Sequence, residues 1–121
     1  MFSEACRFFI MFTYNITFVT APHREQELTD YLRKNLIPAL FNSSSPALNP
    51  ELKKVVEIGG ESPDSEHGLS IALSASFVSL DEANSWYDNT LEPALHDLHL
   101  KFGPYALFFI TLLENLEIQS G

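Results

Sequence analysis

Hydrophobic and polar residues alternate along residues 69–78, and this pattern predicts a β-strand with one buried face. The apolar positions are Leu69, Ile71, Leu73, Ala75 and Phe77, and the positions between them are Ser70, Ala72, Ser74, Ser76 and Val78. The same period over residues 11–19 predicts a first half-buried strand. There Phe12, Tyr14, Ile16 and Phe18 alternate with Thr13, Asn15 and Thr17.

A helix is predicted directly after residue 78, because Ser79 and Glu82 have the spacing of a capping box. In this motif the Ser79 hydroxyl accepts a hydrogen bond from the Glu82 amide. At about 100° per residue one apolar stripe follows, made of Ala83, Trp86, Tyr87, Thr90, Leu91, Ala94, Leu95, Leu98 and Phe102. Pro93 predicts a kink or a restart of the helix, and Gly103-Pro104 predicts its end.

The remaining elements are predicted from periodicity and turn residues. A first helix is expected from Pro22 to about Phe41, bent near its end by Pro38, with a core stripe of Leu28, Tyr31, Leu32, Leu36, Ala39 and Leu40. Residues 42–50 are expected to form a loop, and residues 51–58 a charged edge strand with Val56 and Ile58 inward. An acidic hairpin loop over 59–68 and a last strand over 105–113 complete the chain.

The order strand, helix, strand, strand, helix, strand predicts an α+β, ferredoxin-like βαββαβ fold. We expect a four-stranded antiparallel sheet with two helices on one face. No internal sequence repeat is visible. Residues 11–116 are expected to form the single domain, with residues 1–10 as a dispensable N-terminal extension and residues 117–121 as a C-terminal tail.

Composition narrows the classes of function. The chain has 121 residues, 45% of them hydrophobic, which suits one ordinary domain. A net charge of −9 with seven basic residues argues against nucleic acid and against an anionic membrane surface as partners. No run reaches the roughly 18 apolar residues of a membrane span. Cys6 is the single cysteine, which excludes an internal disulfide and favours a reducing, cytoplasmic location.

Three segments carry a family resemblance: TYNITF in the first strand, YLRKNLIPALF in the first helix, and AL-x-x-x-H-x-K-F followed by FFITLLE at the end. In these segments the chain resembles the uncharacterised bacterial family called domain of unknown function 4286, over roughly residues 11–116. The resemblance implies the same ferredoxin-like unit and no established activity. Two positions that are often polar in that family, His and Arg, are Leu36 and Ile110 here, so chemistry that depends on those groups does not carry over.

The search for a catalytic, cofactor or metal site is negative. His96 and His99 have a spacing that can present two imidazoles to one ion, but a third ligand would have to come from Asp97 or Glu92, which are expected to point elsewhere. Exposed histidines are therefore the favoured interpretation. No phosphate-binding loop or nucleophile elbow is present, and we expect no catalytic residues, no metal and no cofactor.

The last strand poses the main functional question, because both of its alternating sets of residues are strongly apolar. Either set would leave apolar side chains on the sheet face away from the helices, where polar residues are expected, so something should cover that face. One set is Tyr105, Leu107, Phe109, Thr111 and Leu113.

Two hypotheses differ in what covers the face. The first is a non-catalytic interaction or structural protein that forms a homodimer through its open sheet faces, similar to the dimeric α+β barrels. The second is a small-molecule-binding protein or cofactor-free enzyme, with an unknown ligand in a pocket lined by Tyr14, Asn15, Ser74 and Trp86. The first is favoured because no acid, base or nucleophile constellation is visible.

Overall fold

The computed structural model describes residues 11–56 and 69–116. The first half contains β1 (Phe12–Thr20), a 3₁₀ turn (Pro22–Arg24), α2 (Glu25–Tyr31), a π-helical turn (Leu32–Leu36), α3 (Ile37–Leu40) and β2 (Leu48–Lys54). The second contains β3 (Leu69–Phe77), α4 (Leu80–Trp86), a π-helical turn (Tyr87–Leu91), α5 (Glu92–Phe102), a 3₁₀ turn (Gly103–Tyr105) and β4 (Ala106–Glu114). The expectations for residues 1–10, Ile58, the 59–68 loop and the 117–121 tail lie outside the described residues.

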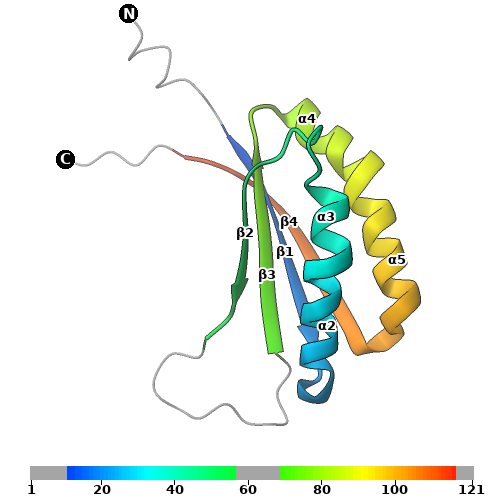
Figure 1. Ribbon diagram of the computed structural model, residues 1–121. Helices are drawn as coiled ribbons and strands as arrows, with labels where there is room; N and C mark the ends of the chain where they lie inside the picture. Colours follow the sequence, from blue (N-terminus) through cyan, green and yellow to red (C-terminus); the bar gives the residue numbers. More distant parts are fainter. Residues whose placement is uncertain (1–10, 57–68, 117–121) are drawn as a thin grey trace, which may run out of the picture.

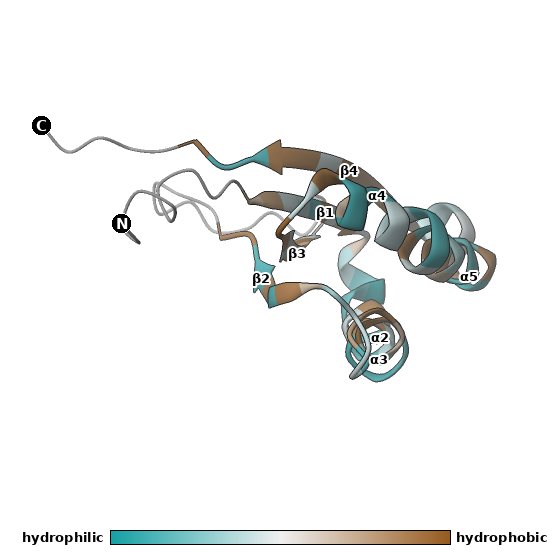
Figure 2. Cartoon of the chain, turned by 90° about the horizontal axis from the view of Figure 1, so that it is seen from above, coloured by the Kyte–Doolittle hydropathy of each residue, from teal (hydrophilic) through white to brown (hydrophobic). Residues whose placement is uncertain are grey.

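The four strands form one antiparallel sheet in the order β2-β3-β1-β4, which confirms the predicted βαββαβ fold. β1 is central and pairs along its whole length with both β3 and β4. The two helical segments cover one face of this sheet, and the other face carries no helix (Figure 1). Figure 2 shows the same two layers from above, with hydrophobic residues along much of β4.

The core lies between the sheet and the two helical segments. Alternate residues of β1 and β3 face the helices, as the period-2 pattern predicts, and they meet the apolar stripes of α2–α3 and α4–α5. The largest fully buried side chains are Phe18, Phe77, Phe102, Ile16, Leu28, Leu32, Leu36, Leu40, Leu73, Leu91 and Leu98. Ala39, which was assigned to the first helix's stripe, is instead exposed.

The two helical segments are joined by a buried hydrogen bond. The Trp86 indole N–H donates to the Leu40 carbonyl at 3.2 Å. Because α3 ends at Leu40, that carbonyl is one of the last-turn acceptors that a helix cannot satisfy internally. Trp86 also packs against Phe77, with ring centroids 4.9 Å apart, and stacks on Phe41 at 5.9 Å. The second helical segment therefore caps the end of the first.

The predicted cap of the second helical segment is present. The Ser79 hydroxyl accepts a hydrogen bond from the Glu82 amide at 3.1 Å, and α4 begins at Leu80. At the other end Gly103 has φ 55° and ψ −133°, a positive-φ conformation that glycine adopts more readily than other residues because it has no Cβ. Both ends of this helical segment were thus readable from local sequence.

The predicted bounds of the third element were wrong by several residues. β2 starts at Leu48, inside the expected 42–50 loop, and ends at Lys54. Its register shifts between Leu48 and Glu51, where Asn49 has φ 51° and Pro50 has no amide hydrogen to donate. The period-2 signal is lost at such a bulge. Leu52, rather than the exposed Val56, is the half-buried residue of this edge strand.

Both prolines stand in the first turn of a new α-helical stretch, Pro38 in α3 and Pro93 in α5, and this agrees with the helix restart expected at Pro93. Each follows a π-helical turn, Leu32–Leu36 before Pro38 and Tyr87–Leu91 before Pro93. The surrounding sequences are Leu-Ile-Pro-Ala-Leu at 36–40 and Leu-Glu-Pro-Ala-Leu at 91–95. The expectation of no internal repeat was therefore wrong: the two βαβ halves share this five-residue pattern and the local structure around it.

Candidate functional site

The facing of β4 is resolved by its register with β1. Ala106, Phe108, Ile110 and Leu112 pair with β1 residues that face the helices, so Leu107, Phe109, Thr111 and Leu113 lie on the open face. The Leu107, Phe109 and Leu113 side chains are 54%, 60% and 48% exposed. β4 thus places a row of exposed apolar side chains along one edge of the open sheet face.

The central strands of the open face carry small and polar side chains. Thr13 on β1 and Ser76 on β3 are hydrogen-bonded through their hydroxyls at 2.9 Å. The Asn15 amide donates to the Thr17 hydroxyl at 3.3 Å. Along β3 the open face consists of Ser70, Ala72, Ser74 and Ser76. Short side chains of this kind leave a flat surface that another sheet can approach closely.

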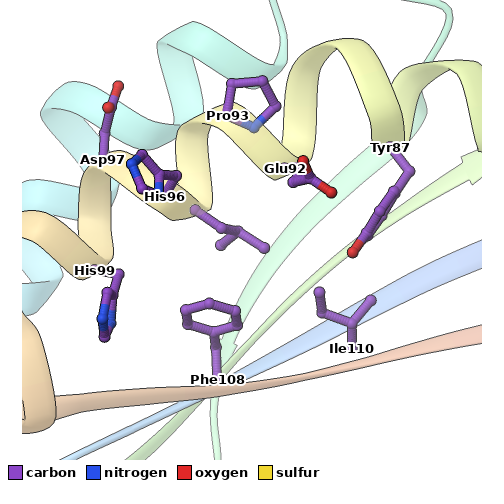
Figure 3. A pocket seen from close by; sticks show the side chains of 9 residues that line it. Tyr87, Glu92, Pro93, His96, Asp97, His99, Phe108 and Ile110 are labelled. Carbon is purple, nitrogen blue, oxygen red and sulfur yellow. The ribbon is translucent and has the colours of Figure 1, made fainter.

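A groove of about 700 Å³ lies on the other side of β4, between this strand and α5. Its lining residues are Tyr87, Glu92, Pro93, Leu95, His96, Asp97, His99, Phe108 and Ile110. In Figure 3 the Phe108 and Ile110 side chains rise from β4, the Tyr87 ring and Glu92 carboxylate lie at one end, and the His99 imidazole lies at the other. Asp97 points away from the strand in this view.

The π-helical turn before α5 explains why Tyr87 and Glu92 meet in this groove. Pro93 lacks an amide hydrogen and its ring crowds the carbonyl four residues earlier. The Glu92 amide donates instead to the Tyr87 carbonyl, five residues back. In an α-helix residues five apart point about 140° away from each other, whereas an i→i+5 turn brings them to nearly the same side. Local backbone structure therefore places both side chains on the same wall of the groove.

Tyr87 stacks on Tyr14 of β1, with ring centroids 5.8 Å apart and an interplanar angle of 26°. Burial raises the pKa of Tyr14, and the neighbouring Tyr87 and Asp88 raise it further. Tyr14 therefore stays neutral well above neutral pH, and the ring stack anchors Tyr87 to the core.

The predicted pocket of Tyr14, Asn15, Ser74 and Trp86 is not a single cavity. Tyr14 and Trp86 are 6% and 3% exposed and belong to the core, whereas Asn15 and Ser74 pair across β1 and β3 on the open face. Neighbouring strand residues such as Tyr14 and Asn15 point to opposite faces, so they cannot line one pocket. The other candidates, Leu107, Phe109 and Thr111, share the open face with Asn15 and Ser74.

His96 and His99 are exposed, as expected, but the groove they line was not foreseen. Glu92 also lines it, although this residue was expected to point elsewhere. A usable signal was present, because positions 92, 96 and 99 are spaced i, i+4, i+7 and share one helix face. Within residues 11–56 and 69–116 no group of three His, Cys, Asp or Glu residues is placed to hold a metal ion.

Among the described helices, none combines the length and the apolar character that crossing a membrane requires.

Comparison with known proteins identifies the family and the fold. The sequence matches the family described as Domain of unknown function (DUF4286) over residues 11–116, and the chain belongs to this family. No match is found among curated proteins.

Solved structures with the same fold have low sequence identity to this chain. A protein from Bacillus halodurans, described as an ethyl tert-butyl ether d (EthD) family protein, has 14% identity and a TM-score of 0.57, covering 88% of this chain and 99% of its own. A protein of unknown function from Nitrosomonas europaea has 12% identity and a TM-score of 0.57, covering 93% and 98%. A DABB family protein from Mesorhizobium loti, described as having a ferredoxin-like fold, has 10% identity and a TM-score of 0.50, covering 91% and 99%. At these identities the likeness shows the ferredoxin-like fold alone.

Proposed function

We propose that this member of the DUF4286 family is a non-catalytic interaction protein that forms a homodimer through its open sheet face. The observation that carries the proposal is the row of Leu107, Phe109 and Leu113 on β4, each about half exposed. Contiguous apolar surface of this kind is typical of a protein–protein contact. A second copy of the same sheet offers a complementary surface, because sheets pack well face to face at about 10 Å.

The charge distribution favours a second copy as the partner. The chain carries a net charge of −9, so two copies repel one another over most of their surfaces. Among the described strands, however, the open face has only Glu51 and Lys53 as charged residues, and these two form an ion pair at 3.3 Å on β2. Contact between open faces therefore brings no unbalanced charge together.

The size of the face is adequate for a dimer. Four strands of up to nine residues, spaced about 4.8 Å apart with a rise of about 3.3 Å per residue, cover roughly 550 Å² of flat area. Side-chain relief makes the accessible area larger than the flat area. A standard stable interface buries about 800 Å² on each partner, which is of the same order.

The proposal that the dimer is non-catalytic rests on the chemistry of the same face. Its polar groups on β1, β3 and β4 are hydroxyls and one amide, Asn15. None of these groups titrates near neutral pH, and a general acid or base needs a pKa close to the working pH. The hydroxyl of Thr13 is already paired with Ser76. Such a surface is suited to packing.

Light scattering coupled to size exclusion tests the dimer. Wild-type protein at micromolar concentration should show twice the chain mass of 13.6 kDa. The double variant Leu107→Glu with Phe109→Glu should elute as a folded monomer, because two carboxylates from each copy would otherwise be buried in the interface. Leu100→Glu is the control, since Leu100 is a leucine on α5 that is 69% exposed, somewhat more than Leu107 and Phe109, and this variant should remain dimeric.

Two results would contradict the proposal. One is a wild-type protein that stays monomeric as its concentration is raised. The other is a double variant that keeps its dimer mass, which would place the contact on a different surface.

A further inference from the structure

The groove between α5 and β4 is independent of the proposed dimer, because the open face lies on the opposite side of β4. At about 700 Å³ it falls within the usual range for small-molecule sites. Like most such sites, it combines an apolar floor with a few polar groups that converge from one wall. The floor comes from Leu95, Phe108 and Ile110, and the polar groups come from the helical wall.

The polar groups are distributed unevenly along the groove. The Glu92 carboxylate and the Tyr87 ring share one end, and the His99 imidazole lies at the other end, beside Phe108 (Figure 3). Glu92 and Asp97 are the acidic side chains of the wall, and they give it the same negative sign as the chain's net charge of −9. Asp97 contributes to this charge from a position that points away from the strand.

This arrangement selects against two ligand classes. An anionic ligand would have to enter a negatively charged groove on a negatively charged protein. A metal ion is not favoured either, since within residues 11–56 and 69–116 no three His, Cys, Asp or Glu side chains are placed to hold one. A cation with an apolar body meets neither obstacle.

We propose that the groove binds a hydrophobic amine. The apolar body of the ligand lies on Leu95, Phe108 and Ile110, and its protonated amine pairs with the Glu92 carboxylate next to the face of Tyr87. An ammonium group gains from a charge-assisted hydrogen bond to a carboxylate and from the negative face of an aromatic ring. Tyr87 is held in place for this contact by its stack on Tyr14.

The π-helical turn is the structural basis for this pairing. The carboxylate and the ring come together because the Glu92 amide bonds to the Tyr87 carbonyl in an i→i+5 turn. π-helical turns of this kind are frequent at functional sites. The turn at Leu32–Leu36 in the first half brings together two apolar residues, Leu32 and Ile37, so the same backbone device carries no charge there.

An NMR titration of the full chain with three probes of similar shape tests the proposal. The probes are 2-phenylethylamine, 2-phenylethanol and 3-phenylpropionate, which present a cation, a neutral hydroxyl and an anion on the same aromatic body. The amine should bind about tenfold more tightly than the alcohol, as expected for one charge-assisted hydrogen bond. The carboxylate should bind more weakly than the alcohol. The amide signals that shift should be those of residues 87–99 and 106–110.

Two substitutions on the same helix locate the charge. Glu92→Gln should reduce amine affinity to about that of the alcohol, again about tenfold, and should leave alcohol binding unchanged. Asp97→Asn removes the same charge from a side chain that points away from the strand, and should change amine affinity by less than about twofold, since exposed charges are screened.

The proposal is overturned if the three probes bind equally, if the carboxylate binds best, or if Glu92→Gln and Asp97→Asn have equal effects. It is also overturned if none of the probes shifts the groove signals at millimolar concentration. The dimer mass is a separate readout, so failure of the amine site and failure of the proposed homodimer are distinguishable.

Discussion

The two βαβ halves of the domain start from the same local pattern and build different surfaces from it. Residues 36–40 and 91–95 share the sequence Leu-x-Pro-Ala-Leu, preceded in both cases by a π-helical turn. After the proline, α3 ends at Leu40, whereas α5 continues to Phe102. That continuation carries His96, Asp97 and His99, three residues of the groove wall. The groove therefore depends on the length of α5 in addition to the π-helical turn that both halves share.

The edge strands of the two halves differ in the same sense. β2 is short and bulged, and it contains Pro50, Glu51, Lys53 and Lys54, which are devices that protect an edge from unwanted pairing. β4 has nine residues in unbroken register with β1, and its first charged residue is its last, Glu114. The edge strand of the first half, β2, is therefore protected against pairing with another strand. The edge strand of the second half, β4, has apolar side chains on both of its faces.

The largest effect on stability should come from truncating Trp86. Its counterpart in the first half is Tyr31, since both residues stand five positions before the first leucine of the shared pattern. Trp86→Ala should lower the free energy of unfolding by about 4 kcal/mol, because a fully packed indole leaves a cavity. Tyr31→Ala should cost about 2 kcal/mol, since Tyr31 is half-buried and packs edge-on against Phe102. Denaturant unfolding of both variants measures the difference. Equal losses of unfolding free energy would contradict this prediction and would mean that Trp86 and Tyr31 contribute equally to the core.

A smaller loss of stability should result from removing only the hydrogen bond between the two halves. Trp86→Phe keeps an aromatic ring but removes the donor to the Leu40 carbonyl, and should cost about 2 kcal/mol for a buried acceptor left without its partner. Faster hydrogen exchange at the end of α3 should accompany the loss. Tyr31→Phe is the control and should change the unfolding free energy by less than about 0.5 kcal/mol. A Trp86→Phe protein with unaltered exchange in α3 would rule out this capping role.

The starts of the two helical segments also differ between the halves. α4 has a side-chain cap from Ser79, whereas Ala21, before the first 3₁₀ turn, supplies none. Ser79→Ala should lower the unfolding free energy by about 1 kcal/mol, the usual cost of losing an N-cap acceptor. Ser85→Ala, six residues further along α4, removes only an exposed hydrogen bond from the Asn89 amide. It should leave the denaturation midpoint nearly unchanged, because alanine has the better helix propensity. If the two variants behaved alike, the cap would have no energetic role.

The smallest effect on stability should come from the two prolines. Pro38→Ala and Pro93→Ala should each change the unfolding free energy by less than about 1 kcal/mol, since both follow turns already adapted to them. Pro93→Ala permits a regular α-helix that separates Tyr87 from Glu92, and should weaken 2-phenylethylamine binding about fivefold through loss of the ring contact. Pro38→Ala should leave binding unchanged. If the Pro93→Ala variant kept its affinity for 2-phenylethylamine, amine binding would not depend on the π-helical turn.

Particular residues show how far local sequence signals reach. The Ser79 cap, the Gly103 stop and the β3 alternation were readable because each depends on neighbours within a few positions. β2 was misplaced because the bulge at Asn49-Pro50 removes the period on which strand prediction rests. The candidate pocket failed for a different reason, since Tyr14 and Asn15 were grouped by chemistry although strand geometry puts them on opposite faces.

The sequence by itself determined the order of elements, the helix ends and the residues available for the core, because periodicity, caps and breakers act over short spans. Only the tertiary structure decided which apolar set of β4 meets the helices, since both sets satisfy the period-2 pattern equally and the choice is made by register with β1. It likewise decided that Glu92, Tyr87, His99 and Phe108 line one groove. The groove depends on how α5 packs against β4, and a local sequence pattern does not specify how two elements distant in the chain pack together.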